Sequence, residues 1–146
     1  MPAKRVTEIC IRLAKHKKEN KELLDYLLFE AGNEETFVSN VKEEIDIQFR
    51  DLNKSNLYLA KKTLRKVLRT VNKFTRYSGI KKTELELRIY YCRKFLETGI
   101  DYTKNKVLFN LYNNQLSKID LTLSKLHEDV QFDFLKEISE LKSQHL

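Results

Sequence analysis

Residues 57–78 read LYLAKKTLRKVLRTVNKFTRYS, and the spacing of their apolar side chains is the clearest indication of fold class in the chain. Apolar residues recur three and four positions apart, which places them on one stripe of an α-helix. The stripe contains Leu57, Ala60, Leu64, Val67, Val71 and Phe74, with Leu68 beside it. Candidate caps for the free N–H groups at its start are Asn53, Ser55 and Asn56. Gly79 follows where a left-handed residue would end the helix.

The same helix lies within the most basic part of the chain. Residues 52–83 contain ten Lys and Arg residues and no Asp or Glu. At about 100° per residue, five of these cations cluster opposite the apolar stripe and are expected to face water. These five, called the basic face below, are Lys62, Lys66, Arg69, Lys73 and Arg76. A solvated outer surface is the commonest explanation for such a run, and a surface for nucleic acid or polyphosphate, or for an acidic protein or segment, is the alternative.

Charge is distributed unevenly along the chain, whose net charge is +7. Residues 1–21 carry seven cations and two anions, and residues 22–51 carry two cations and nine anions. After the basic run, residues 84–146 carry nine cations and ten anions. The acidic segment directly precedes the basic one, so two antiparallel helices would let them partly neutralise each other. Exposed ion pairs of this kind contribute about 0–1 kcal/mol each. The sequence leaves open whether the acidic segment covers the basic run.

Length and composition favour one helical domain. A chain of 146 residues with 41% hydrophobic residues has enough apolar side chains for a core of its own. Three glycines and one proline provide few turn residues, which is typical of long helices with short links. We therefore predict an all-α fold over residues 1–146, either a six- or seven-helix antiparallel bundle or a short stack resembling α-helical repeats.

The other predicted helices follow from the same periodicity. They span about 3–17, 21–31, 33–52, 81–98 and 104–142. Apolar side chains surround the helix at 21–31 on nearly all sides, which is typical of a central buried helix. Thr83 and Glu86 have the spacing of a capping box, so Thr83 is a second candidate for the start of the helix at 81–98.

The last segment carries a heptad seam. Its apolar residues are Phe109, Tyr112, Leu116, Ile119, Leu123, Leu126 and Val130. Such a seam is either part of the core of a bundle or the interface of a homodimer, because both use this geometry. Beyond it the apolar pattern changes phase near His127, which predicts a break followed by a new helix at Glu128, although one long helix over 104–142 is the alternative.

The two cysteines, Cys10 and Cys92, lie on predicted apolar stripes and belong to no metal-ligand or redox motif. Two buried free thiols are therefore expected, as in the reducing cytoplasm. The N-terminus lacks the apolar run of a secretory signal, and no stretch is apolar enough to span a bilayer. Cytoplasmic location without membrane attachment is the resulting expectation.

Residues with catalytic or metal-binding potential are few. None of His16, His127 and His145 has a second His or Cys at ligand spacing. His127 is followed by two carboxylates at 128 and 129, and this cluster is interpreted as the polar start of a helix. We therefore predict no catalytic residue, no metal and no cofactor. The predicted function is a non-catalytic interaction or scaffolding protein with an unidentified protein partner, and nucleic-acid or polyphosphate binding through the basic face is the alternative.

Overall fold

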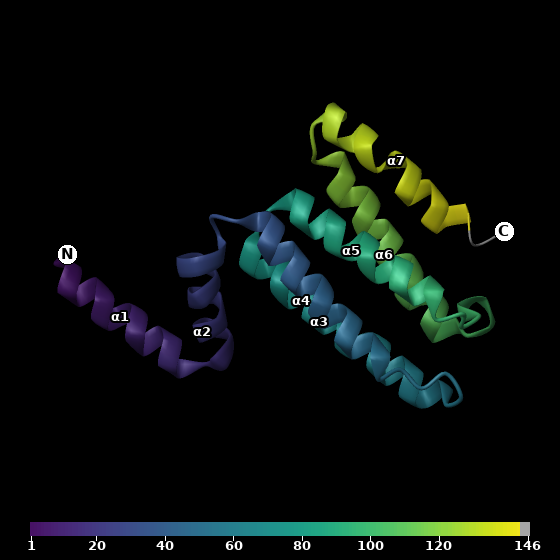
Figure 1. Cartoon of the computed structure of the whole chain (residues 1–146), viewed down its shortest axis with the longest axis horizontal. Coiled ribbons are helices and arrows are strands. Elements are labelled where there is room, and N and C mark those ends of the chain that lie inside the picture. The colour runs from purple at the N-terminus through teal and green to yellow at the C-terminus, as the bar shows by residue number, and fades with distance from the viewer. Residues whose placement is uncertain (144–146) are drawn as a thin grey trace. The chain divides into compact units, whose positions relative to one another are not determined.

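The computed structural model describes residues 1–143, which are almost entirely helical (Figure 1). Among these residues there are seven α-helices and no strand, so the all-α prediction is confirmed. In chain order the elements are α1 (Ala3–His16), α2 (Lys18–Asp25), a π-helical turn (Tyr26–Glu30), α3 (Glu34–Arg50), α4 (Leu57–Ser78), α5 (Lys81–Glu97), a 3-10 turn (Tyr102–Lys104), α6 (Lys106–Ser124) and α7 (Glu128–Ser143).

The chain divides into two compact units. Residues 1–37 form the first unit, and the second unit begins at Val38. Helix α3 starts in the first unit and continues into the second. The single domain expected over residues 1–146 stays a prediction. Within the described residues, no helix combines the length and the apolar character needed to cross a membrane.

Helix α4 has the bounds that its periodicity and end signals predict. Of the three candidate caps, Asn56 is the one used: its Oδ1 accepts a hydrogen bond from the backbone N–H of Leu59 at 3.2 Å. At the other end, Gly79 adopts a φ of 67°, a left-handed conformation that only glycine takes without steric cost.

In the second unit, α5 is the central helix, and α3, α4, α6 and α7 all contact it (Figure 1). The hydroxyl of Tyr91 donates a hydrogen bond to the carbonyl oxygen of Leu64 on α4 at 2.9 Å. The hydroxyl of Tyr90 donates to Oδ1 of Asp46 on α3 at 2.6 Å. The buried residues of α5 are Thr83, Leu85, Leu87, Arg88, Ile89, Tyr91, Cys92 and Phe95. The helix begins at Lys81, so Thr83 is buried within it and is not its cap.

Aromatic side chains fill the core between α5 and α6. The ring centroid of Phe95 lies 5.3 Å from that of Tyr112 and 5.6 Å from that of Tyr102. Phe95 and Tyr112 have no exposed surface. The hydroxyl of Tyr112 donates to the carbonyl oxygen of Leu141 at 2.8 Å, which ties α6 to α7. Aromatic pairs at such distances contribute about 0.5–1.5 kcal/mol each beyond the burial of their surface.

The segment at 104–142 forms two helices, because α6 ends at Ser124 and α7 begins at Glu128. This break lies where the apolar pattern changes phase, as predicted. The central seam residues are buried within the chain: Tyr112, Leu116 and Ile119. The outer ones are less covered, since Leu123, Leu126 and Val130 are half-buried and Phe109 is exposed. The core interpretation of the seam is confirmed at its centre, and those side chains are not free to contact a second copy.

The first unit has a small core. Neither α1 nor α2 contains a buried residue, and within residues 1–37, all of which are described, the buried side chains are Tyr26 and Phe37. Their ring centroids lie 4.6 Å apart, and the hydroxyl of Tyr26 donates a hydrogen bond to Glu34. The π turn between them is defined by the N–H of Ala31, which donates to the carbonyl oxygen of Tyr26 at 2.9 Å, five residues back.

The expectation of a central, buried helix at 21–31 is wrong. Leu27, Leu28 and Phe29 are 57%, 63% and 77% exposed. A helix that is apolar on all sides is buried only where neighbours surround it, and the helix that packs against α2 in this unit is α1. Cys10 is exposed for the same reason. Burial was expected for both thiols, and it is found for Cys92 but not for Cys10.

Candidate functional site

The basic face lies on the outer side of α4, as its spacing predicts. Lys62, Lys66, Arg69 and Arg76 are exposed, and Lys73 is half-buried. The Nζ of Lys73 lies 4.7 Å from the ring centroid of Phe74, in cation–π contact. From position 62 to position 76 the face runs for about 21 Å, at about 1.5 Å per residue.

Four of the five basic-face residues form no ion pair with the acidic segment in the described part of the chain. Within residues 1–143, no carboxylate lies within 4.0 Å of the charged nitrogens of Lys62, Lys66, Arg69 or Arg76. Asp46 of α3 instead lies 3.3 Å from the Nζ of Lys94 on α5. Between α3 and α4, the amide of Gln48 donates a hydrogen bond to the hydroxyl of Thr70 at 3.0 Å. Lys62, Lys66, Arg69 and Arg76 therefore present charge that no carboxylate of residues 1–143 pairs with.

One end of the basic face opens into a polar depression of about 440 Å³ between α4, α5 and α6. Arg76 contributes to its lining from α4, Lys81, Glu84 and Arg88 from α5, and Lys118 from α6. Sequence analysis did not single out the residues from α5 and α6 as a site, because the helices that carry them come together only in the folded chain.

Arg88 is 5% exposed and forms part of the lining of this depression. Its Nη1 donates to Oδ1 of Asn72 at 3.0 Å and to Oε1 of Gln115 at 2.9 Å, so it links α4, α5 and α6. Its Nε donates to Oε2 of Glu84 at 3.1 Å, and its Nη2 lies 2.9 Å from the same oxygen. These hydrogen bonds to three residues offset part of the cost of burying the Arg88 charge.

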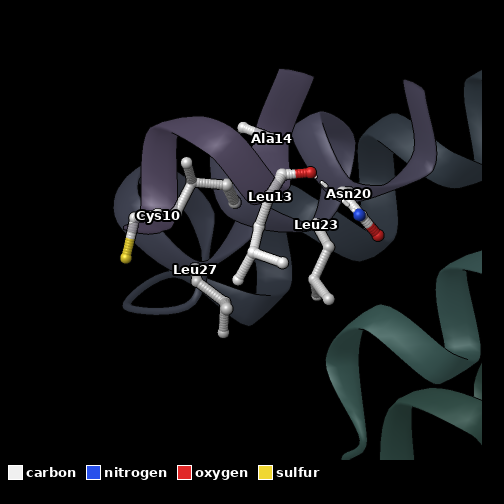
Figure 2. A pocket seen from close by; sticks show the side chains of 7 residues that line it. Cys10, Leu13, Ala14, Asn20, Leu23 and Leu27 are labelled. Atoms are coloured by element: carbon white, nitrogen blue, oxygen red, sulfur yellow. Dashed lines mark hydrogen bonds between the residues drawn. The ribbon is translucent and has the colours of Figure 1, made fainter. Parts of the chain in front are cut away.

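An apolar groove of about 210 Å³ runs between α1 and α2 in the first unit (Figure 2). Its lining consists of Cys10, Leu13, Ala14, Asn20, Leu23, Leu24 and Leu27. Figure 2 shows Leu13, Leu23 and Leu27 gathered on one side of the helix pair. The amide of Asn20 donates to the carbonyl oxygen of Leu13 at 2.9 Å and holds the link between the two helices. Because Asn20 is the one amide among these lining side chains, the groove offers a nearly apolar, open surface.

The two thiols are expected to differ strongly in reactivity. Cys10 is exposed beside the groove, whereas Cys92 is buried and burial raises its pKa to about 12. At about pH 8 a thiol with that pKa is ionised in about one molecule in ten thousand. We expect iodoacetamide at that pH to alkylate Cys10 within minutes and Cys92 at least about a hundredfold more slowly, as followed by intact mass. Equal rates for the two thiols in the folded protein would contradict the burial of Cys92.

In the part of the chain that the structure describes, no group of three or more His, Cys, Asp or Glu side chains is arranged to hold a metal ion. His127 is exposed, and its Nδ1 accepts a hydrogen bond from the N–H of Asp129 at 3.2 Å, which fits the polar helix start that we predicted. His16 is exposed on α1, and His145 lies outside the described residues.

Comparison of the chain with protein-family models, with curated proteins and with solved structures gives no significant match.

Proposed function

We propose that this protein is a non-catalytic interaction protein, and that the groove between α1 and α2 receives an amphipathic helix of a protein partner. The observation that carries the proposal is the exposure of Leu13 and Leu27, two leucines that line the apolar groove. Monomeric proteins rarely expose contiguous apolar surface of this kind, and where they do it marks an interaction site.

The size of the first unit supports the same conclusion. A unit of 37 residues is below the length at which a chain usually buries enough apolar surface to be stable alone. Two packed helices with an apolar groove provide the surface on which a third helix lays its apolar stripe, in the arrangement that peptide-binding grooves use. Docking of a partner helix in the groove would bury the side chains of Leu13 and Leu27, which the unit by itself leaves exposed.

A display selection of amphipathic helical peptides on the purified chain tests this proposal. We expect retained peptides to share apolar residues at spacings of three, four and seven, and to lose at least about tenfold in affinity on the Leu13→Lys/Leu27→Lys variant. A dye attached to Cys10 would report occupancy of the groove by a shift in emission. The matched control is Leu121→Lys/Leu135→Lys, two exposed leucines of the second unit. Peptides that bind all three proteins equally would contradict a site in the groove.

A second candidate function is polyanion binding through the basic face. The observation that favours it is the row of exposed cations on α4 that form no ion pair with a described carboxylate. One strand of a nucleic-acid duplex presents a phosphate about every 3.4 Å, so a face about 21 Å long matches several phosphates.

Binding of labelled RNA and DNA at about 50 and 200 mM salt tests the second function. Affinity is expected to fall at least about tenfold over this range, because phosphate contacts release bound counterions. The Lys62→Gln/Lys66→Gln/Arg69→Gln variant is expected to weaken binding strongly. Its control, Lys106→Gln/Lys125→Gln/Lys136→Gln, removes the same charge from other exposed positions of the second unit. Equal losses in the two variants would show that net charge, and not the basic face, attracts the polyanion.

A further inference from the structure

The depression between α4, α5 and α6 gathers cations that lie far apart in sequence. Its charged lining consists of Arg76, Lys81, Arg88 and Lys118 with one carboxylate, Glu84, which gives a formal charge of +3. Glu84 is already neutralised, since Arg88 lies 2.9 Å from it and Lys81 3.9 Å. Within the described chain, Arg76 and Lys118 form no ion pair.

Arg88 makes this depression more than a patch of surface lysines. Its guanidinium is fixed by Asn72, Glu84 and Gln115, so it presents a charge whose position does not have to be ordered when a ligand binds. Its Nη2 contacts Oε2 of Glu84 and has no second acceptor among the residues that the structure describes. A buried N–H group normally has a partner, and here an acceptor in the depression would supply it.

The start of α5 adds to the positive potential. Lys81 is the first residue of α5, and Ile80 before it provides no side-chain cap. The free N–H groups of a first helical turn carry partial positive charge, which favours an anion at that position. This contribution is secondary, because the cationic side chains and the buried Arg88 define the site.

We infer that this depression binds a phosphate-bearing anion, with Lys81, Lys118 and Arg76 on the phosphate oxygens and Arg88 at its base. A phosphate group matches the site better than a carboxylate, because its three terminal oxygens can accept from cations on different helices at once. The depression is open, so an oligophosphate and the phosphorylated end of a larger molecule present the same chemistry to it.

This inference goes beyond the proposed docking of a helix in the first unit, and it shares only Arg76 with the basic face. Lys81 and Lys118 lie outside the basic face, whereas Lys62 and Lys66 lie outside the depression. The two sites are therefore separable by substitution. All four lysines are exposed, so their replacement by glutamine is expected to leave the fold intact.

Calorimetric titration of the full chain with tripolyphosphate tests the site. We expect the Lys81→Gln/Lys118→Gln variant to bind at least tenfold more weakly than wild type, and the Lys62→Gln/Lys66→Gln variant, with the same charge change, to bind within about twofold of it. A parallel titration with a neutral peptide bearing one phosphoserine distinguishes a phosphorylated end from a free oligophosphate. With either ligand, a loss of affinity in Lys81→Gln/Lys118→Gln that Lys62→Gln/Lys66→Gln does not show supports the site.

Two results would overturn the inference. One is the absence of binding by either ligand at millimolar concentration, with melting curves showing that the protein is folded. The other is an equal loss in both variants, which would mean that the anion responds to overall charge and not to the depression. Failure of the helix-docking proposal leaves these outcomes unaffected, because the ligands and the substituted residues are different.

Discussion

Replacing Arg88 by methionine is expected to lower the free energy of unfolding by about 3 kcal/mol. The substitution leaves the buried amide of Gln115 without its donor and the partly buried carboxylate of Glu84 without its closest cation. Each unsatisfied buried group costs about 1–3 kcal/mol, and the apolar contacts of methionine offset only part of that cost. Urea unfolding followed by circular dichroism measures the change.

The matched control is Arg93→Met on the same helix. Arg93 also forms an ion pair, 2.6 Å from Glu137, but both side chains are close to half exposed. Exposed pairs contribute about 0–1 kcal/mol, so this variant is expected to unfold close to the wild-type midpoint. Equal destabilisation by the two substitutions would show that the buried network around Arg88 has no special role in holding α4, α5 and α6 together.

Replacing Phe95 by alanine is expected to cost about 3–5 kcal/mol, the largest effect of any single substitution proposed for the core. Phe95 has no exposed surface, and its ring contacts those of Tyr102 and Tyr112. Removal of the ring loses its transfer free energy and leaves a cavity that rigid aromatic neighbours fill poorly. Thermal and urea unfolding of the variant measure the cost.

Phe132→Ala provides the control, because Phe132 is 75% exposed and belongs to the same unit. Its removal is expected to change stability by no more than about 0.5 kcal/mol. Phe95→Leu keeps most of the apolar volume and gives a measurable intermediate loss if the alanine variant does not fold. Similar losses for Phe95→Ala and Phe132→Ala would contradict the core described here.

Several helix boundaries were predictable from local signals. The range of α4 follows from its apolar period together with Asn56 and Gly79 at its two ends. The start of α3 is similar: Oδ1 of Asn33 accepts from the N–H of Thr36 at 3.2 Å, as expected of a cap. The break between α6 and α7 was visible as a phase shift of the apolar pattern near His127, and residues 125–127 separate the two helices. In each case residues within a few positions of the boundary determine it.

The burial of α2 was not predictable in the same way. Its leucines are compatible with a position at the centre of a bundle, and no local signal shows how many neighbours surround them. The π turn at Tyr26–Glu30 also lacks a local signal, because no glycine or proline accompanies it. Burial depends on which helices meet, which is a property of the whole chain.

The buried network of Arg88 had a signal that sequence analysis did not use. Arg88 lies three positions after Leu85 and four before Cys92, so it occupies the core stripe of α5. Gln115 likewise lies three positions after Tyr112 and four before Ile119, on the core stripe of α6. A polar residue at a core position of one helix indicates a partner on a neighbouring helix. Matching Arg88 with Gln115 in this way would have indicated the contact between α5 and α6. It would not have indicated the depression between α4, α5 and α6.

Site-specific photo-cross-linking from position 27 shows whether a partner polypeptide occupies the groove between α1 and α2. A photoreactive amino acid replaces Leu27 beside the groove or, as control, Ser139 on the exposed side of α7, and extracts of the native cell type are irradiated. We expect a discrete product with another polypeptide from position 27 and none from position 139. That polypeptide, once purified, should bind the wild-type chain and lose binding to the Leu13→Lys variant. Cross-links from position 27 that stay within the same chain, or that match those from position 139, would contradict a docking groove between α1 and α2.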